Sequence, residues 1–398
     1  ARISFVTFGC KTNWADSLRI MKALPTKLWQ VVEPDELPDV VLFNSCTVTA
    51  KAERDLMRAL RRVRAGREDT RLIVTGCMAE AYRERVEALI DGVEIYGLKE
   101  RGRLLASLGA DERNPDWPTI ESLDTRPRTR AFLKIQEGCD STCSYYIVPT
   151  ARGTSRSLSG YRVEALVEGA ARRGIGELVL SGIHLGLYGQ DRPEREGLPE
   201  LLDRLAAVRE RLAREGGGSR PFPRIRLSSI EPNEVDEALI GAVQRHDFVA
   251  RHLHIPLQSG DARILRAMRR RYRVEGVVEA VERVATALSP AGIGVDVLLG
   301  FPGEDDAAFE ATQRLLEGLP ITYLHAFSYS PRPGTDAAEM RPQVDPRRVK
   351  ERVAVLRQLS ARKRDAFADS FVGTETEMLV EGRRTNGRLE GYTGTYCR

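Results

Sequence analysis

Three apolar runs near the start of the chain each end at a cysteine, and this repeat strongly constrains the fold. The runs are RISFVTFGC, DVVLFNSC and RLIVTGC, which end at Cys10, Cys46 and Cys77. Stretches with helical spacing of apolar residues, such as 52–66, separate them. Strands that alternate with helices form a parallel sheet, so residues 1–113 are predicted to be a Rossmann-like α/β domain. The three cysteines are then expected at the carboxyl edge of that sheet, where open α/β sheets bind ligands.

Three thiols that converge at a sheet edge could hold three irons of an iron–sulfur cluster and leave one iron open. A structural zinc site with one further ligand is an alternative, as is a set of unrelated buried cysteines. The chain has six cysteines among 398 residues, and their wide, uneven spacing is unlike a disulfide scaffold. Because we find no signal peptide and no apolar stretch of membrane-spanning length, we expect a cytoplasmic protein with no membrane partner.

A second strand–helix series follows a proline-rich, polar stretch at 114–130, which we interpret as a linker. Over residues 131–368, six strand-like runs alternate with helical stretches, which predicts an open or partial (β/α)6 barrel with its functional groups on the loops after the strands. Residues 369–398 change to a period-two pattern, which predicts the start of a small β-barrel and a chain truncated within it. The six runs are 130–139, 176–186, 224–232, 252–260, 292–304 and 321–335.

The stretch GCDSTCSYYIVP follows the first predicted strand of the barrel. It places Cys139 and Cys143 four positions apart, and Tyr146 stands where a third thiol would follow. Gly138 and Pro149 favour a loop over a helix. A CxxxCxxC loop at this place in a β/α barrel is the signature of the radical S-adenosylmethionine enzymes, and two of its three cysteines are present here. By itself the stretch is either a cluster loop with one ligand replaced or a chance pair of cysteines.

Ordered stretches along almost the whole chain resemble the methylthiotransferase family of radical enzymes. They are FVTFGCKTN, NSCTVTAKAERD, VTGCMAE, KIQEGCDSTCSYYIVPTARGTSRS, VLSGIHLGLYG, SSIEP, HLHIPLQSG, MRRRY, GFPGE and SYSPRPGT. The FGCKTN start, CTVT and SSIEP are most similar to the branch that modifies threonylcarbamoyladenosine in tRNA. The branches that act on isopentenyladenosine and on a ribosomal protein aspartate usually differ at those places.

The resemblance implies two 4Fe–4S clusters, S-adenosylmethionine and a methylthio transfer to carbon 2 of threonylcarbamoyladenosine at position 37, beside the anticodon. It also implies a radical-SAM barrel followed by a TRAM-like β module, and a reductant as electron donor; we expect a monomer. An aromatic C–H bond has no useful acidity, so the cofactor carries the hard step while the protein orients the reactants and excludes water. The implied cluster ligands are Cys10, Cys46 and Cys77 for an auxiliary cluster, and Cys139, Cys143 and the position of Tyr146 for the radical-generating one.

Polar residues and glycines after the barrel strands are candidates for binding S-adenosylmethionine or substrate. Ordinary turn chemistry is the alternative for each of them. His252 and His254 alternate along one predicted strand, and satisfied core histidines are the alternative reading there. The candidates are Ser181 and Gly182 near the methionine moiety, Ser228, Ser229 and Glu231 near a ribose or the substrate, Gly300, Gly303 and Glu304 near the adenine, and Gln258 as a further lining residue.

Arginine is abundant and clustered, although the net charge is only +4. The segments 263–273 and 345–365 are strongly basic, which is typical either of a phosphate-facing surface or of a solvated helix face. We expect the first, with the anticodon stem-loop of tRNA as the partner. Of the arginines singled out, Arg152 and Arg156 could bind either a phosphate or a carboxylate. The full set for this surface is Arg152, Arg156, Arg269, Arg270 and Arg271.

Tyr146 departs from the family pattern at the third cluster position. A phenol oxygen with a pKa near ~10 is a poor substitute for the thiolates that iron–sulfur clusters take. We therefore expect Tyr146 to impair the radical-generating cluster. The alternatives are a catalytically silent tRNA-binding relative and a methylthiotransferase that acts on a different modified adenosine.

Overall fold

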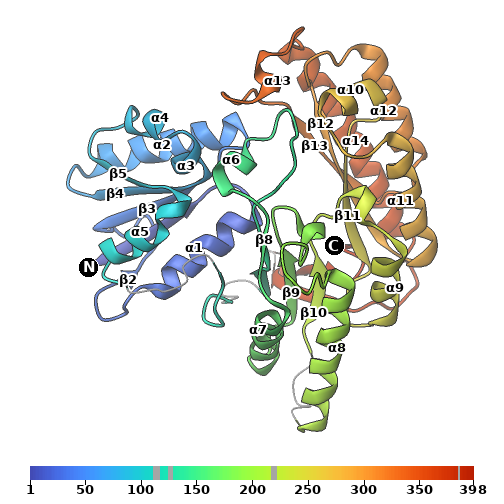
Figure 1. The fold of residues 1–398 in the computed structure, drawn as a ribbon, viewed down its shortest axis with the longest axis horizontal. Coiled ribbons are helices and arrows are strands. Elements are labelled where there is room, and N and C mark those ends of the chain that lie inside the picture. Colours follow the sequence, from blue (N-terminus) through green and yellow to red (C-terminus); the bar gives the residue numbers. More distant parts are fainter. Residues whose placement is uncertain (111–116, 124–128, 217–221, 384–385) are drawn as a thin grey trace.

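The N-terminal part of the chain is a three-layer α/β sandwich (Figure 1). The structure is a computed structural model, and it describes residues 1–110, 117–123, 129–216, 222–383 and 386–398. Five parallel strands form one sheet in the order β2-β1-β3-β4-β5, which confirms the predicted parallel sheet. The strands are β1 (Arg2–Thr7), β2 (Gln30–Val31), β3 (Val40–Ser45), β4 (Arg71–Gly76) and β5 (Val93–Tyr96).

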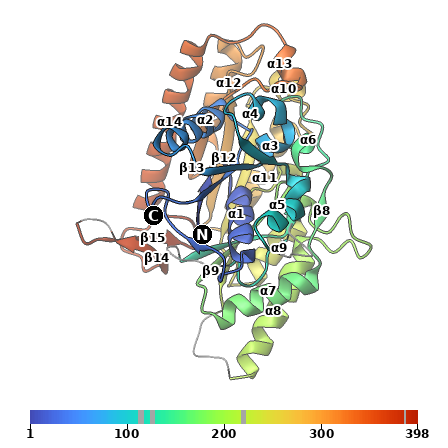
Figure 2. The same ribbon diagram turned by 90° about the vertical axis from the view of Figure 1, so that its left-hand side faces the viewer.

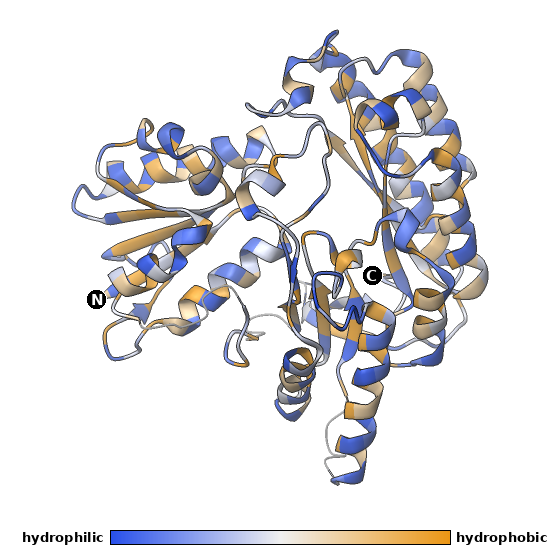
Figure 3. Cartoon of the chain, in the orientation of Figure 1, coloured by the Kyte–Doolittle hydropathy of each residue, from blue (hydrophilic) through white to orange (hydrophobic). Residues whose placement is uncertain are grey.

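Alternation along β3 explains why helices cover both faces of this sheet. Val40 and Leu42 pack on one face with α1 (Lys11–Ala23) and α5 (Arg101–Ser107). Val41 and Phe43 pack on the other face with α2 (Ala50–Gly66), α3 (Cys77–Ala81) and α4 (Arg83–Glu87). Successive strand side chains point to opposite faces, so a continuous apolar run such as this one requires cover on both sides. Figure 3 shows the apolar strands between helices whose outer faces are polar.

The second part of the chain is a partial β/α barrel of six parallel strands, as predicted. It consists of two three-stranded sheets, β10-β9-β6 and β11-β12-β13. Single bridges from Ile225 to Val249 and from Ser229 to His254 join the two sheets. The strands are β6 (Arg130–Lys134), β9 (Glu177–Ser181), β10 (Arg224–Leu227), β11 (His252–Gln258), β12 (Gly292–Leu299) and β13 (Tyr323–Ser328).

Amphipathic helices cover the outside of the barrel (Figures 1 and 2). Short helices and strands interrupt the segments between the barrel strands and the long helices. They are α6 (Val148–Arg152), α10 (Ala262–Ala267), α13 (Asp336–Glu339), β7 (Gln136–Glu137) and β8 (Arg156–Ser157). No helix in the described part of the chain combines the length and apolarity needed to cross a membrane. The long outer helices are α7 (Gly160–Arg172), α8 (Leu198–Arg214), α9 (Glu237–Arg245), α11 (Val274–Ala287), α12 (Asp306–Gly318) and α14 (Pro346–Asp369).

The period-two pattern at the C-terminal end forms an antiparallel hairpin of β14 (Met378–Arg383) and β15 (Leu389–Thr393). The hairpin packs against the barrel, because Arg226 Nη2 donates to the backbone oxygen of Thr393 at 2.9 Å. Arg130 also forms an ion pair with Glu381. Of the predicted linker, residues 114–116 and 124–128 lie outside the described residues, as does the boundary at 113, so the domain limits stay a prediction.

A buried polar network joins the N-terminal domain to the barrel. Lys134 on β6 reaches Asp16 on α1 at 2.6 Å and Glu137 at 2.7 Å. Arg152 on α6 contacts the same two carboxylates at 3.1 and 2.8 Å, and Arg101 approaches Asp16 at 2.6 Å. All of these side chains are nearly inaccessible to solvent. Each buried charge in this network therefore has at least one buried partner of opposite charge, and several of these pairs join the N-terminal domain to the barrel.

Candidate functional site

Cys10, Cys46 and Cys77 follow three adjacent strands, β1, β3 and β4, at one edge of the N-terminal sheet. They gather around Asn13, whose Oδ1 lies 3.5 Å from Cys10 Sγ and 3.9 Å from Cys77 Sγ. A Cβ on Gly9 would lie 2.6 Å from the Cβ of Cys46, and Gly9 has a φ of +102°. Only glycine fits there, because a side chain would both strain the backbone and displace the thiol.

This thiol set fits an iron–sulfur cluster in the chemistry of its donors. Burial raises the pKa of Cys77 to about 12, although the nearby Arg152 guanidinium acts in the opposite direction. Burial also raises the pKa of Cys46. Buried thiols of this kind are protonated without metal and release their protons when a metal binds. Arg152 Nε lies 3.2 Å from Cys77 Sγ, so a cation already faces the position where negative sulfur would form.

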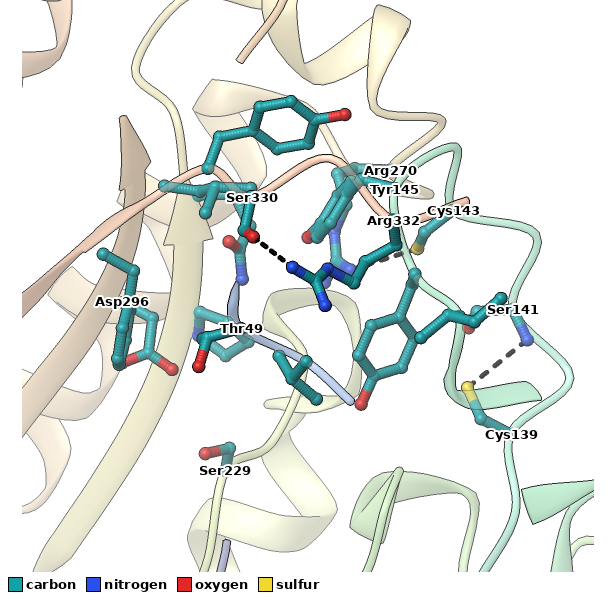
Figure 4. A pocket seen from close by; sticks show the side chains of 18 of the residues that line it. Thr49, Cys139, Ser141, Cys143, Tyr145, Ser229, Arg270, Asp296, Ser330 and Arg332 are labelled. Atoms are coloured by element: carbon teal, nitrogen blue, oxygen red, sulfur yellow. Dashed lines mark hydrogen bonds between the residues drawn. The ribbon is translucent and has the colours of Figure 1, made fainter. Parts of the chain in front are cut away.

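The second cysteine loop follows β7, and Cys139 and Cys143 line the pocket shown in Figure 4. Cys139 Sγ accepts a hydrogen bond from the Ser141 amide at 3.4 Å, and Cys143 Sγ accepts one from Arg270 Nη1 at 3.2 Å. Burial raises the pKa of the Tyr146 phenol well above its ordinary value, so the hydroxyl keeps its proton. Two thiols and a neutral phenol do not provide the three thiolates of a radical-SAM cluster. The loop of this chain therefore does not fit that cluster as it stands.

His184 and Glu234 belong to this site and were not predicted from the sequence. His184 Nδ1 lies 3.5 Å from Cys139 Sγ, and its Nε2 lies 2.6 Å from Glu234. Burial opposes a charge on His184, but the contacts to Cys139 and Glu234 prevail and raise its pKa to about 10. Burial likewise opposes a Cys139 thiolate, yet hydrogen bonds from His184 and Ser141 lower the pKa of this thiol. The available signal was the position of His184 just after β9, where barrel enzymes carry functional groups.

A cavity of about 330 Å³ adjoins the cysteine loop. Of the residues predicted to bind S-adenosylmethionine or substrate, Ser229, Glu231 and Gln258 line it. Arg270 also lines it and forms an ion pair with Glu231. Figure 4 shows Thr49 from the N-terminal domain and Arg332 from the segment after β13 around the same space. The cavity is therefore built from both parts of the chain.

A second cavity of about 480 Å³ lies next to the first and reaches the N-terminal thiol set. Cys10 and Tyr146 both line it, as do the predicted residues Ser181, Gly182, Ser228 and Ser229. Tyr146 borders both cavities. Cys139 and Cys143 thus line one cavity, and Cys10 lines the cavity next to it.

Gly300 and Glu304 do not line either cavity. A Cβ on Gly300 would lie 2.3 Å from Val349 of α14, so this glycine permits close packing of a helix. Glu304 accepts a hydrogen bond from the Gly300 amide at 3.1 Å and pairs with Arg352. The turn-chemistry alternative describes both residues better than contact with an adenine does.

The predicted phosphate-binding arginines lie in different environments. The prediction is wrong for Arg152, because its guanidinium is buried and held by Asp16 and Glu137. Arg270 lies in the cavity wall and not on the outer surface, so its contact with nucleic acid stays a prediction. The remaining three are exposed: Arg156, Arg269, which pairs with Asp336, and Arg271, which donates to the Asp140 carbonyl.

Comparison with known proteins gives matches to both parts of the chain. Residues 2–96 match the family described as uncharacterized protein family UPF0004, and residues 133–316 match the radical SAM superfamily. The chain is 32% identical over 419 residues to the threonylcarbamoyladenosine tRNA methylthiotransferase MtaB of Bacillus subtilis, an alignment that covers 100% of this chain and 90% of that protein. It is 34% identical over 396 residues to the tRNA-2-methylthio-N(6)-dimethylallyladenosine synthase of Thermobifida fusca, with coverage of 95% and 78%.

A solved structure shares the fold at low sequence identity. The radical S-adenosylmethionine methyltransferase TsrM from Kitasatospora setae aligns with a TM-score of 0.58 at 16% identity, covering 85% of this chain and 77% of that one. The parallel N-terminal sheet, the partial barrel and the full-length relatives agree with one another. The chain belongs to the radical S-adenosylmethionine methylthiotransferase family.

Proposed function

We propose that this chain is a tRNA methylthiotransferase whose substrate is threonylcarbamoyladenosine at position 37, modified at carbon 2. The observation that supports it most is the placement of two cysteine regions on adjoining cavities within a full-length match to this family. Several relatives at 31–32% identity carry the name threonylcarbamoyladenosine tRNA methylthiotransferase. Within the family, S-adenosylmethionine and iron–sulfur clusters supply the radical chemistry.

Two clusters are part of the proposal, and the two sites differ in how well their residues suit one. Cys10, Cys46 and Cys77 would hold the auxiliary cluster. The second site offers Cys139 and Cys143 but no third thiol, so we propose that Tyr146 impairs it.

The chain's own residues would bind and orient the reactants. The target base must leave its stack to reach a site between the barrel and the N-terminal domain, and the adjoining cavities provide space for an extruded nucleotide. The ion pair of Arg270 and Glu231 places paired charges in the cavity wall, where they can hold polar groups of a ligand. Gln258 and Ser229 add uncharged hydrogen-bonding groups to the same wall. The first cavity has walls from both parts of the chain, which would limit the access of water to the reacting groups.

The decisive experiment compares the protein with its Tyr146→Cys variant after anaerobic reconstitution. We expect about four irons per chain in the protein with Tyr146 and about eight in the variant, since each cubane holds four irons. Mass spectrometry of nucleosides from treated tRNA should show the methylthio product with the variant and much less with Tyr146 present. A Tyr146→Cys protein that still holds four irons and forms no product would refute the proposal.

A catalytically silent tRNA-binding relative is the second candidate, and Tyr146 itself favours it. Incubation with S-adenosylmethionine, dithionite and substrate tRNA separates the two functions. Formation of 5′-deoxyadenosine above the level of a protein-free control would exclude the silent relative. No such product from either the protein or its Tyr146→Cys variant, together with tight tRNA binding, would support it.

The base specificity needs its own test, because the family includes proteins named for dimethylallyladenosine. Transfer RNA that carries threonylcarbamoyladenosine and tRNA that carries dimethylallyladenosine should be offered to the Tyr146→Cys variant in parallel. We expect methylthiolation of the first only. The reverse preference would assign the chain to the other substrate.

We further propose a monomeric, cytoplasmic enzyme that binds the anticodon stem-loop and receives electrons from a separate reductant. Exposed arginines such as Arg269 and Arg271 would contact phosphates. Affinity for tRNA should therefore fall steeply between 50 and 200 mM salt, because phosphate contacts release counterions. Filter binding across that range measures the slope, and an affinity that does not change with salt would argue against this surface.

A further inference from the structure

Three polar side chains on neighbouring barrel strands meet in the larger cavity. His254 lies on β11, Asp296 on β12 and His325 on β13. The pairing register places His325 directly opposite Asp296, and all three residues line the cavity of about 480 Å³. His254 Nε2 lies 2.9 Å from Asp296 Oδ1, and His325 Nδ1 lies 3.2 Å from the same oxygen. Their ligand atoms all lie within 4.8 Å of one another, and this is the one such trio within the described ranges.

These separations suit ligands of a single metal ion. Metal–ligand bonds of about 2.0–2.1 Å at right angles place neighbouring ligand atoms about 3 Å apart. The observed 2.9 and 3.2 Å agree with that spacing. Two histidines and one carboxylate on one side of an ion, with the other positions open, are a common binding set for first-row divalent metals.

The environment of His254 strengthens this reading. Its other ring nitrogen, Nδ1, lies 3.1 Å from the Tyr323 hydroxyl, which also lies 2.8 Å from His252 Nε2. A histidine that ligates a metal usually has its second nitrogen held in this way, which fixes the ring and the tautomer.

We propose that His254, Asp296 and His325 bind a divalent first-row metal ion at a site separate from both cysteine sets. Its free coordination positions face the cavity that Cys10, Ser228 and Tyr146 also line. Those positions take water or an oxygen of a bound nucleotide. The site uses no thiol, so it goes beyond the proposed clusters and does not depend on whether Tyr146 permits the second one.

A test with Mn²⁺ distinguishes this site from the cysteines, because Mn²⁺ prefers oxygen and nitrogen ligands to thiols. The full chain, purified without oxygen, is titrated with Mn²⁺ while the electron paramagnetic resonance signal of the free ion is followed. We expect one ion bound per chain. Asp296→Asn and His325→Ala should each weaken binding by about tenfold or more. His325 is half-exposed, so His325→Ala should fold normally even if Asp296→Asn does not.

Two control variants define the outcome. Asp203→Asn removes another carboxylate that lies beside a histidine, His246, at the protein surface, and Cys10→Ser removes the thiol that lines the cavity. Neither should change Mn²⁺ binding. Mn²⁺ should also raise the melting temperature of the protein but not that of His325→Ala.

Failure to bind Mn²⁺, or equal binding by the protein and His325→Ala, would overturn the metal site and leave a hydrogen-bonded His–Asp–His trio. Loss of binding in Cys10→Ser would overturn it as well. The iron count of the Tyr146→Cys variant tests the proposed function independently, because none of the three residues in this trio is a proposed cluster ligand.

Discussion

At the scale of single residues, Arg152 is a charged side chain that was expected to contact nucleic acid but is buried. It was counted among the arginines predicted to contact nucleic acid, although a carboxylate was the other partner considered. In the structure it lies inside the protein, where Asp16, Glu137 and Cys77 surround its guanidinium. Asp16 and Cys77 lie more than 70 positions away along the chain, so no local pattern reveals these contacts.

Removal of this guanidinium should destabilise the fold strongly. Arg152→Met roughly keeps the length of the side chain but leaves buried carboxylates without one of their cations. The free energy of unfolding should therefore fall by about 3–5 kcal/mol. Urea unfolding at neutral pH measures the change. Arg269→Met is the matched control, because Arg269 is exposed and its ion pair with Asp336 should contribute no more than about 1 kcal/mol. Equal losses in the two variants would contradict the structural role.

The contact between His184 and Cys139 makes a second prediction at this scale. His184→Ala removes a hydrogen bond that lowers the pKa of the thiol, while burial, which raises it, remains. The thiolate of Cys139 should therefore form at higher pH in the variant. The rate of alkylation by iodoacetamide as a function of pH, with the site identified by mass spectrometry, reports the change. His246→Ala, which removes a histidine paired with Asp203, should leave the profile unchanged.

At the scale of elements, the strand–helix alternation and the terminal hairpin follow from the sequence. Period-two and period-3.6 patterns depend on local spacing, and the six barrel strands and the parallel N-terminal sheet were predicted from them. The trio on β11, β12 and β13 was not predicted. Its assembly depends on strand register, which brings His325 opposite Asp296, and register is a non-local property.

Glu177 on β9 links three elements and predicts a dependence of stability on pH. Its buried carboxylate accepts hydrogen bonds from Arg226 and Arg224 of β10, and Arg226 also holds the backbone of β15. Burial by itself would raise the pKa of Glu177, but the two arginines outweigh it and lower the pKa. The folded state therefore binds this proton less readily than the unfolded chain does, so the stabilisation is present above about pH 4.3 and is lost as the pH falls.

Glu177→Gln tests this dependence. The variant should be less stable at pH 7 by about 3–5 kcal/mol, because Arg226 loses its buried counterion. Its stability should also change less between pH 6 and pH 3 than that of the unmodified protein, as measured by urea unfolding. Glu215→Gln, at an exposed ion pair with Arg172, serves as the control and should leave the pH dependence nearly intact.

At the scale of the whole molecule, the buried network across the two parts of the chain should make them depend on each other. Asp16 on α1 and Lys134 on β6 lie 2.6 Å apart and both are inaccessible to solvent. A double-mutant cycle with Asp16→Asn and Lys134→Met should give a coupling energy of about 1.5–3 kcal/mol. Additive effects of the two substitutions would mean that the parts fold independently of this contact.

The same scale brings out a consequence of the position of Tyr146. Its side chain borders both cavities, as do Ile183, Ser229, Asp296 and Phe327, so Tyr146 forms part of the boundary between the cavity beside the barrel loop and the cavity beside Cys10. Replacement by cysteine would therefore have two effects. It supplies a thiol, and the smaller side chain widens the connection between the two cavities. Tyr146→Ser would widen the same connection without adding a thiol. If the Tyr146 side chain blocks the passage of ligands between the two cavities, Tyr146→Ser should allow that passage. Because serine adds no thiol, the effect would be independent of cluster formation.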